Sequence, residues 1–365
     1  MLAPPWFSVP PRGYGGTEEV LAGLVNSLVA RGHHVILIGS GPRLTTAQEF
    51  VAVYDDPPSS RLGDPMPEVV HAAAAGRILA GLDVDIVHDH TLAGPLTARA
   101  SRSAVVVTAH GPLSRDHRRY FRELGGTVNL VAISDSQRQL APHLTWAGRV
   151  HNGVDVATFP LGDGAGGYLL FIGRFSPDKG AHLAIEAARA VGLPLVLAGK
   201  LNEAPERAYF DAAVRPRLGP GVTYVGEADA AAKRELYAGA AALLFPVCWE
   251  EPFGMVMVEA MACGTPVLAL RRGSVPEVVD HGHTGLVVDS PDQLPHAICR
   301  IDEIDRTACR RHAERWFDVS VMATGYERVF GSVLRHNLNA PSTTRPLPSR
   351  PSVERVRSVD SRKAP

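Results

Sequence analysis

Two glutamates, Glu251 and Glu259, lie eight positions apart, and the second stands inside an apolar run that continues to Cys263. A helix that is apolar on nearly every side is a buried helix. An ionised carboxylate inside such a helix costs several kcal/mol unless another group hydrogen-bonds it. Glu259 therefore requires a partner, which is either a protein group or a ligand.

The residues between the two glutamates break a strand and begin a helix, since Pro252, Phe253 and Gly254 precede the apolar run. The first amides of that helix, from Gly254 to Val256, have no intrahelical acceptor, and such amides bind anions and hydroxyls. A loop carboxylate, these amides and a helix carboxylate could in turn bind a sugar, a phosphate and a ribose diol, the last as in dinucleotide sites. The structural alternative is that Glu251 caps the helix and Glu259 pairs with a buried arginine.

This segment resembles the E-x7-E signature of retaining glycosyltransferases of the GT4 family, which have the GT-B fold. The resemblance extends over nearly the whole chain, through the motifs Pro11–Glu18, His110–Gly111, His151–Asp155, Gly173–Gly180 and Gly273–Glu277. Most of these motifs are weak singly, and together they are a strong signal. The resemblance implies an α/β protein of two Rossmann-like, doubly wound parallel-sheet domains that face a cleft.

The order of apolar runs predicts the same architecture. Strand-like runs alternate with helical patterns, which is typical of parallel, doubly wound sheets. The expected strands are Val35–Ile38, Ile86–Val87, Val105–Thr108, Leu130–Ile133, Leu169–Ile172, Leu195–Ala198, Val222–Val225, Leu243–Pro246 and Val267–Leu270. The Gly-rich stretch Pro160–Gly167 has no apolar period and is the expected linker between the two sheets. Ligands then bind at the carboxyl ends of the strands.

The apolar patterns divide the chain into four parts, and the resemblance implies what each part does. We expect an N-terminal acceptor-side domain over residues 1–158, a C-terminal nucleotide-sugar-binding domain over 167–318, a helix that crosses back over 319–336, and a disordered tail over 338–365. Thr17 is the expected N-cap of the first helix and Gly32 its terminator. Met1–Pro5 resembles only the end of the family's first strand, which suggests a misplaced start codon or a truncated sequence.

Composition excludes several classes of protein. The chain has 365 residues, enough for two domains, and its net charge of −1 argues against a nucleic-acid binder. Its four cysteines form no close-paired metal spacing and are expected to be reduced thiols in a cytoplasmic protein. No apolar run approaches the roughly 20 residues that span a bilayer. Peripheral membrane contact stays open, because GT4 enzymes often use lipid-linked acceptors.

The chemistry of glycosyl transfer indicates which side chains to expect. Negative charge builds on the departing diphosphate, so the site needs cations and amides beside it. By resemblance, Arg174 and Lys179 contact the diphosphate, Glu251 meets the sugar hydroxyls near the reacting centre, and Glu259 holds the ribose. The alternative is that Arg174 and Lys179 are ordinary solvated charges.

Other positions complete the predicted site. Gly15 and Gly16 permit close backbone approach at a helix start, unless they form an ordinary loop. His110 resembles the cleft histidine near the transferred sugar, and its alternative is a local hydrogen bond. The nucleobase is expected against the backbone of Val225 and Gly226, close to Glu227.

Two further clusters of acidic residues or histidines could suggest metal sites, but the strand pattern argues against both. Asp83 and Asp85 resemble the metal-binding Asp-x-Asp of the other glycosyltransferase fold, but they precede a strand and point away from the cleft. In His88-Asp89-His90, alternation puts the two histidines on one face and the aspartate on the other, which disfavours a metallohydrolase centre. We expect no metal and no cofactor besides the nucleotide-sugar co-substrate.

We therefore predict a metal-independent, retaining glycosyltransferase that moves a hexose from a UDP- or GDP-sugar to a small-molecule, glycan or lipid-linked acceptor. The rivals are a nucleotide-sugar epimerase or hydrolase and a non-catalytic nucleotide-sugar binder. Trp6, Tyr14 and Trp249 line a sugar platform or only pack. The predicted catalytic residues are His110, Arg174, Lys179 and Glu251. The predicted donor-binding residues are Gly15, Gly16, Arg174, Lys179, Val225, Gly226, Glu251, Phe253, Gly254, Met255, Val256 and Glu259.

Overall fold

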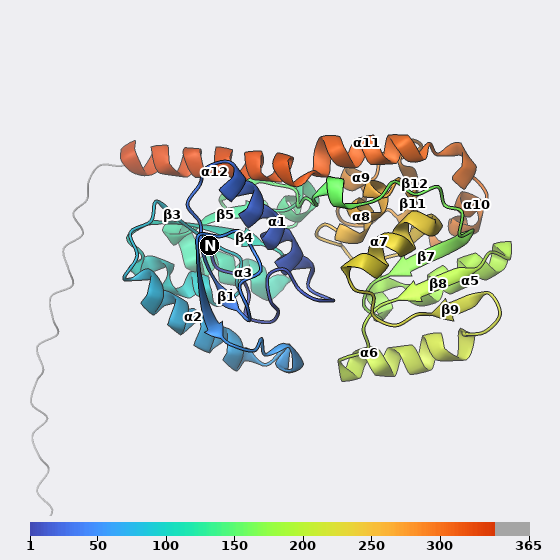
Figure 1. The fold of residues 1–365 in the computed structure, drawn as a ribbon, viewed down its shortest axis with the longest axis horizontal. Helices are drawn as coiled ribbons and strands as arrows, with labels where there is room; N and C mark the ends of the chain where they lie inside the picture. The colour runs from blue at the N-terminus through green and yellow to red at the C-terminus, as the bar shows by residue number, and fades with distance from the viewer. Residues whose placement is uncertain (340–365) are drawn as a thin grey trace, which may run out of the picture.

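The computed structural model describes residues 1–339, which form two α/β domains side by side, with the last two helices following one another along one edge of both domains (Figure 1). The last helix, α12 (Val319–Asn339), begins where we predicted and runs three residues further. Its final two residues belong to the segment that we predicted as a tail. The rest of that predicted tail lies outside the described residues.

The N-terminal domain is built on parallel strands. Its strands are β1 (Ile36–Ser40), β2 (Glu49–Tyr54), β3 (Ile86–Asp89), β4 (Ala104–Ala109), β5 (Asn129–Ala132) and β6 (Trp146–Arg149). Its helices are α1 (Gly16–Ala30), α2 (Pro65–Leu79), α3 (Arg115–Leu124) and α4 (Asp135–Gln139). Strands β3 to β6 pair in chain order, and β1 pairs with β2. Leu2 bridges Ile38 and Asp89 in parallel register, so Met1–Ala3 lies between β1 and β3 and joins the two pieces.

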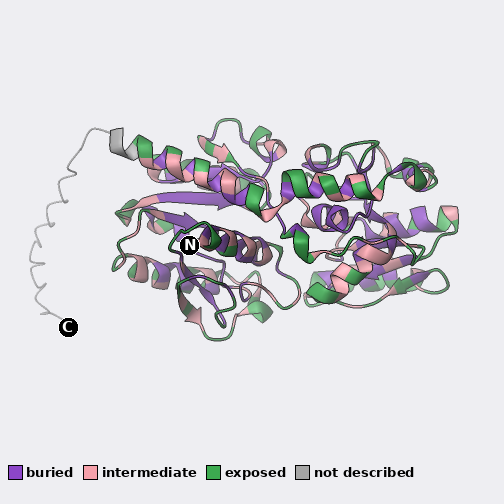
Figure 2. Cartoon of the chain, turned by 45° about the horizontal axis from the view of Figure 1, so that its top comes forward, coloured by how far each residue is buried: buried purple, intermediate pink, exposed green. Residues whose placement is uncertain are grey.

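The C-terminal domain has one six-stranded parallel sheet with the order β12-β11-β10-β7-β8-β9. Its strands are β7 (Tyr168–Ile172), β8 (Leu195–Ala198), β9 (Val222–Tyr224), β10 (Ala240–Phe245), β11 (Val267–Leu270) and β12 (Gly285–Val288). Its helices are α5 (Ala181–Val191), α6 (Ala204–Tyr209), α7 (Ala230–Gly239), α8 (Met255–Ala262), α9 (Val275–Val278), α10 (Leu294–Ile298) and α11 (Arg306–Phe317). Buried strands stand at the centre of both domains, and the covering helices expose their outer faces (Figure 2).

The prediction of two doubly wound parallel sheets is confirmed, since every predicted strand coincides with an observed one. Three strands were missed, namely β2, β6 and β12. None of the residues of β2 and β6 is fully buried. Strand β6 lacks the continuous apolar run that marks a central parallel strand, whereas β2 carries one over residues 50–54 and was missed all the same.

Helix α1 begins at Gly16, and its N-cap is Gly15 with φ of 149°. The predicted N-cap, Thr17, is therefore wrong, because the chain turns into the helix two residues earlier. A Cβ on Gly15 would lie 2.8 Å from Cβ of Pro11, so close backbone approach selects glycine there. At the other end, Gly32 follows the helix with φ of 90°, as predicted for the terminator.

The domains are joined by two chain crossings that lie side by side. Val154 donates its amide to the carbonyl of Phe317 and accepts from the amide of Val319, both at 2.9 Å. The predicted linker Pro160–Gly167 lies after this crossing and packs on the C-terminal domain, where the amide of Gly162 donates to Cys263 O at 2.9 Å. The crossing therefore lies at residues 151–155.

Helix α12 packs on α1 as the crossing-back helix should. Met322, Tyr326 and Val329 of α12 share one buried cluster with the apolar face of α1, which includes Leu21 and Leu24. Each fully buried side chain of this size contributes about 1.5–3 kcal/mol relative to an exposed one. Helix α12, near the C-terminus, thus holds α1, near the N-terminus, in place. None of the helices within residues 1–339 is long and apolar enough to cross a bilayer.

Glu18 provides a test of burial in α1. Burial raises the pKa of its carboxyl to about 8, so the folded protein keeps the proton while the unfolded chain releases it near 4.5. Stability should consequently fall by about 1.4 kcal/mol per pH unit as pH rises through this window. Glu18→Gln removes that loss and should unfold at higher temperature than wild type at pH 8, with little difference at pH 4.5. Thermal unfolding at both pH values measures this effect.

Exposed Glu235 of α7 supplies the control, because Glu235→Gln should show no such pH-dependent gain. A Glu18→Gln protein that is no more stable than wild type at pH 8 would contradict the burial argument.

Candidate active site

A cavity of about 360 Å³ lies between the two domains at the carboxyl ends of their strands. The N-terminal domain and the crossing contribute Tyr14, Gly16, Thr17, His110, Gly111, Ile133 and Asn152 to its lining. The C-terminal domain contributes Phe171, Ile172, Gly173, Arg174, Lys179, Phe245, Trp249, Glu251, Pro252, Phe253, Gly254, Met255 and Val256. Nine predicted site residues therefore line this one cavity: Gly16, His110, Arg174, Lys179, Glu251, Phe253, Gly254, Met255 and Val256.

A second cavity of about 130 Å³ continues from the first along α8. The two cavities share Tyr14, Gly16, Ile172, Gly173, Met255 and Val256. Gly15 and Glu259, also predicted, line the second cavity together with Lys200, Glu227 and Lys233. The pair forms one elongated space, with Glu251 at one end and Glu259 at the other.

Glu251 is bonded to a cation and not to the start of the helix. Its Oε2 accepts from Nζ of Lys179 at 2.5 Å and from Nε1 of Trp249 at 3.0 Å. Oε1 accepts from none of the described residues. The helix-capping alternative for Glu251 is wrong, because the N-cap of α8 is Gly254 in a left-handed conformation with φ of 79°. One carboxylate oxygen thus fixes the lysine while the other is available in the cavity.

The amides at the start of α8 are free as predicted. Met257 donates to Gly254 O at 3.0 Å, and no acceptor for the amides of Gly254, Met255 and Val256 is found within residues 1–339. These three residues all line the first cavity. The helix start therefore presents unpaired donors where a negatively charged or hydroxyl-bearing group can bind.

Glu259 has two protein partners. Its Oε1 accepts from Nζ of Lys233 at 3.0 Å, and its Oε2 accepts from the hydroxyl of Tyr237 at 2.7 Å. Burial lowers the pKa of Lys233, but the charge and hydrogen bond of Glu259 outweigh this and leave it raised. A structural partner was one of our two expectations for Glu259, but the partners are a lysine and a tyrosine instead of an arginine. The carboxylate still lines the second cavity.

Two cations reach the cavity from the turn after β7. Lys179 ends the short 3₁₀ helix Pro177–Lys179, and its ammonium lies over the ring of Trp249, 5.0 Å from the centroid. Arg174 is half-buried and has no hydrogen-bond or ion-pair partner among the described residues. The simple view of two solvated surface charges does not fit, since both side chains line an interdomain cavity. Arg174 is the unpaired positive charge of this wall.

The glycine-rich loop before α1 reaches across to the other domain. The amide of Tyr14 donates to Oε1 of Glu227 at 2.7 Å, and Nζ of Lys200 lies 4.8 Å from the centroid of the Tyr14 ring. A Cβ on Gly13 would lie 2.4 Å from the same Glu227 oxygen. The loop thus closes over the second cavity, with Gly13 packed directly on the carboxylate of Glu227.

His110 follows β4 and is bonded to another histidine. Its Nε2 lies 2.8 Å from Nδ1 of His90, whose ring packs 4.0 Å from that of His88. Burial lowers the pKa of His110 to about 4 and, with the neighbouring imidazoles, holds the pKa values of His88 and His90 well below their usual range. The three rings are neutral at physiological pH, so His110 meets the cavity as an uncharged hydrogen-bonding group.

The other histidine-rich and acidic candidates behave as the strand pattern predicted. His88 and His90 share one face, and Asp89 on the other face accepts from the amide and hydroxyl of Thr91. Asp83 and Asp85 precede β3 and are not among the residues of the two cavities described above. Within residues 1–339, no group of three or more His, Cys, Asp or Glu is arranged to hold a metal ion.

The predicted nucleobase contacts lie beside the second cavity. Val225 and Gly226 are absent from the residues that line it, whereas the next two positions, Glu227 and Ala228, belong to its wall. The carbonyl of Gly226 accepts from the amide of Gly199 at 2.9 Å, which fixes the turn after β9. Contact of the base with Val225 and Gly226 stays a prediction.

Asn152 was not predicted as a site residue, and the roles of Trp6, Tyr14 and Trp249 were left open. Asn152 is 5% exposed, and its Oδ1 has no partner among the described residues, although it lines the first cavity. Its place in the motif His151–Asp155 was the available signal. Tyr14 and Trp249 line the cavity as expected for a sugar platform. Trp6 instead donates to Oε1 of Glu68 at 3.1 Å, inside the N-terminal domain.

Comparison with solved structures identifies the class that this fold and cleft define. AviGT4, a glycosyltransferase involved in avilamycin A biosynthesis, is 28% identical with a TM-score of 0.68, over 90% of this chain and 93% of that chain. HepE of Anabaena in complex with UDP-glucose gives a TM-score of 0.71 at 18% identity, over 91% of this chain and 98% of that chain. The architecture is the GT-B fold of glycosyltransferases, as predicted.

Sequence comparison gives the family. A family model described as Glycosyltransferase Family 4 matches residues 14–158, and one described as Glycosyl transferases group 1 matches residues 163–315. The phosphatidyl-myo-inositol mannosyltransferase of Mycolicibacterium smegmatis is 28% identical over 91% of this chain and 93% of its own. The glycogen synthase of Mycobacterium tuberculosis is 26% identical over 94% of this chain and 96% of its own. The chain belongs to the family 4 glycosyltransferases, which confirms the predicted enzyme class.

A pair of glycines tests how the cation-bearing turn is held. Gly180 and Gly192 flank α5, with φ of 75° and 70°. A Cβ on Gly180 would lie 2.1 Å from Pro246 O, while one on Gly192 would meet nothing within 4 Å. Gly192→Ala should cost about 1–2 kcal/mol for its left-handed backbone, and Gly180→Ala should cost about 1–3 kcal/mol more because β10 must shift.

Urea unfolding of both variants measures the difference. Equal losses in the two proteins would show that Gly180 does not set the distance between Lys179 and β10.

Proposed function

We propose that this protein is a retaining glycosyltransferase that moves a hexose from a UDP- or GDP-sugar to an acceptor, without a metal ion in its site. The observation that carries the proposal is the elongated space with Glu251 at one end and Glu259 at the other. Arg174, Lys179 and the free amides of α8 lie on one wall, and His110 lies on the opposite wall. This is the arrangement that a nucleotide sugar needs.

The diphosphate is the part of the donor that this wall suits best. Negative charge grows on the leaving diphosphate as the glycosidic bond breaks. Arg174 and Lys179 supply positive charge, and the amides from Gly254 to Val256 supply hydrogen-bond donors at a helix start. These groups can stabilise the diphosphate by themselves, which supports a metal-independent reaction.

The nucleoside is proposed to extend from the diphosphate into the second cavity. Glu259 would there share its carboxylate between Lys233, Tyr237 and the ribose hydroxyls. The names of similar proteins support a hexose, since one is a mannosyltransferase and another was solved with UDP-glucose. The choice between uridine and guanosine is the question that binding measurements answer.

The sugar is proposed to lie between Glu251 and His110. Oε1 of Glu251 can accept from a sugar hydroxyl, while Oε2 holds Lys179 beside the diphosphate. In this arrangement Glu251 orients the sugar and need not act as a nucleophile. Substitution on the same face, assisted by the leaving phosphate, would then retain the anomeric configuration.

The acceptor is proposed to approach from the N-terminal domain, on the side of His110 and Gly111. Its class is a small molecule, a glycan or a lipid-linked molecule, and the last would bring the protein to a membrane surface. One similar protein is named for a lipid acceptor, phosphatidyl-myo-inositol. We propose a cytoplasmic location, in keeping with four free cysteines, Cys263 and Cys309 among them being buried.

Thermal unfolding with nucleotides is the first test. UDP or GDP, and the matching UDP-glucose or GDP-mannose, should raise the unfolding temperature of the wild type, whereas ADP should not. A ligand at about 100 times its dissociation constant adds about 2.7 kcal/mol. Glu259→Gln keeps an acceptor for Tyr237 but loses the charge, and it should bind the same nucleotide at least about tenfold more weakly. Glu303→Gln, an exposed position of the same domain, should bind like wild type.

Turnover and stereochemistry form the second test. Lys179→Ala and Glu251→Ala should each reduce transfer about 100-fold or more, as loss of one preorganised charge partner does elsewhere. The product of an α-linked donor should be α-linked by nuclear magnetic resonance. Unchanged rates in both variants would exclude the proposed site.

Two outcomes of the same assay would favour other functions. Consumption of donor without an acceptor conjugate would indicate an epimerase or hydrolase. Specific binding of one nucleotide without turnover over a broad acceptor panel would indicate a non-catalytic binder.

A further inference from the structure

The segment that carries His110 is held from both sides by one buried side chain. Nε2 of Gln137 donates to the carbonyls of Ala109 and Gly111, at 2.8 and 2.9 Å. Oε1 of Gln137 accepts from the amide of Ile133 at 2.9 Å. Gln137 is 1% exposed, and its bonds to Ile133 and Ala109 are buried, whereas the bond to Gly111 is partly buried. The residues on either side of His110 are therefore fixed to helix α4.

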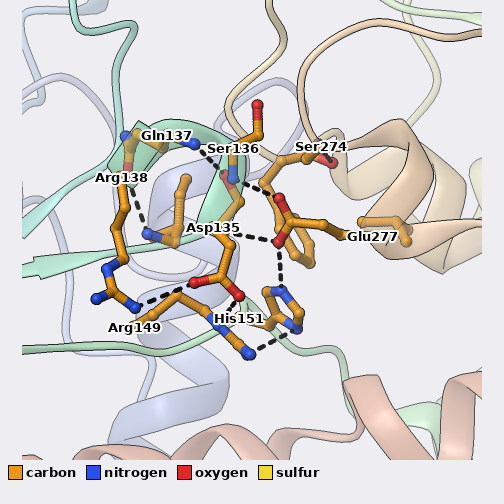
Figure 3. Close-up of polar contacts among 12 residues, drawn as sticks. Asp135, Ser136, Gln137, Arg138, Arg149, His151, Ser274 and Glu277 are labelled. Carbon is orange, nitrogen blue, oxygen red and sulfur yellow. Dashed lines mark hydrogen bonds and ion pairs between the residues drawn. The ribbon is translucent and has the colours of Figure 1, made fainter. Parts of the chain in front are cut away.

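Helix α4 is in turn bound to the other domain. Glu277 of α9 in the C-terminal domain accepts from the amide of Asp135 at 2.7 Å through Oε2 and from that of Ser136 at 2.5 Å through Oε1 (Figure 3). These are the first two amides of α4, which have no acceptor within their own helix. A single carboxylate from one domain thus completes the start of a helix in the other.

The crossing segment joins the same cluster. Nε2 of His151 lies 3.2 Å from Oε2 of Glu277, and Nδ1 of His151 lies 3.2 Å from Nη1 of Arg149 (Figure 3). Because the guanidinium can only donate, Nδ1 must accept and Nε2 must carry the hydrogen that reaches Glu277. Burial opposes ionisation of Glu277, but the hydrogen bonds from His151 and the two amides outweigh it and lower its pKa. The carboxylate is therefore charged when it binds α4.

The other end of this path touches the donor site. The amide of Ser274, which precedes α9, donates to Glu251 O at 2.9 Å, and its hydroxyl donates to Phe253 O at 2.7 Å. Gly273 lies so close that a Cβ there would be 2.2 Å from Glu251 O. The turn that leads into Glu277 is thus packed directly on the backbone of Glu251.

We propose that Glu277 and Gln137 are positioning residues that set the place of His110 relative to the donor-binding loop of Glu251. Contacts run without interruption from Glu251 through Ser274 to Glu277, then to the start of α4, and through Gln137 to the carbonyls beside His110. Neither residue touches the donor in this scheme. The proposal rests on the proposed function, because it assigns His110 a place beside the transferred sugar.

Two substitutions separate positioning from packing. Gln137→Glu keeps the size of the side chain and the acceptor for Ile133, but it loses at least one of the two hydrogens that bond Ala109 O and Gly111 O, because a protonated carboxyl has one hydrogen to donate and an ionised one has none. Glu277→Ala removes the acceptor for α4 from the partly exposed domain boundary and leaves both cores intact. Glu303→Ala is the matched control, since Glu303 is exposed in the C-terminal domain and, within residues 1–339, forms an ion pair only with Arg300.

Hydrogen exchange tests the path without any substrate. In Glu277→Ala, amides of residues 109–113 and 133–139 should exchange about tenfold faster, although the substitution lies in the other domain. Gln137→Glu should accelerate residues 109–113. Glu303→Ala should leave both segments unchanged. Equal exchange in wild type, Glu277→Ala and Gln137→Glu would overturn the proposal, whatever the enzyme transfers.

A double-mutant cycle tests the link to the reaction, with UDP-glucose and GDP-mannose as probes. Gln137→Glu and Glu277→Ala should each lower the turnover number about 10- to 100-fold, with UDP or GDP affinity kept because the nucleotide lies on the C-terminal domain. Glu277→Gln should fall between wild type and Glu277→Ala. In a His110→Ala background, Gln137→Glu should cause little further loss.

The outcomes of this cycle are distinct. Losses that multiply in the double variant would mean that Gln137 does not act through His110, and the proposal would fail. A wild type that turns over neither probe would instead count against the proposed donor, and hydrogen exchange would still decide whether Glu277 and Gln137 position the His110 segment.

Discussion

The relative placement of the two domains depends on one short backbone pairing. Val154 and the residues beside Asp318 run side by side where the chain crosses twice between the domains. A Cβ on Gly153 would lie 3.0 Å from the carbonyl oxygens of both Phe317 and Asp318, so any other residue there would push the two crossings slightly apart. Every residue of the cleft belongs to one or the other side of this pairing.

Helix α12 extends the same constraint into the N-terminal domain. It starts at the crossing, and its buried face packs on α1, whose first residues line the cleft. Helix α12 thereby supports the glycine-rich loop before α1, which lines both cavities. Packing of α12 on α1 thus links a helix late in the sequence to the cavity that the start of α1 lines.

The sequence predicted the parts of this structure that depend on continuous apolar runs. Central strands such as β7 and β11 are buried on both faces and carry unbroken apolar residues. The edge strand β2 is only partly buried and was not recognised. The start of α1 was misplaced because backbone crowding at Gly15 prevailed over the capping preference of Thr17. Local patterns thus determine the sheets, whereas tertiary crowding determines their ends.

The sequence predicted which types of residue form the candidate site, but it did not predict which groups are hydrogen-bonded to them. The isolated carboxylate of Glu259 indicated that a partner must exist. Lys233 and Tyr237 lie 26 and 22 positions upstream on α7, and no periodicity connects them with α8. Gln137 is uncharged, so its isolation from water gave no sign in the sequence, and Asn152 was marked only by its place in the motif His151–Asp155. Such residues become recognisable only when the fold shows which groups they face.

The uncharged histidine side and the positively charged side of the cleft give it an electrostatic polarity. Its C-terminal wall carries Arg174 and Lys179, while the N-terminal wall presents the imidazole of His110, which burial keeps uncharged. The electrostatic potential therefore falls from the C-terminal wall to the N-terminal wall. For the proposed reaction, this field draws the electrons of the breaking bond toward the diphosphate and leaves the developing positive charge of the sugar facing a wall that does not repel it. An acceptor hydroxyl would then meet the sugar on its electron-poor side, so the fold polarises the reaction before any catalytic group moves.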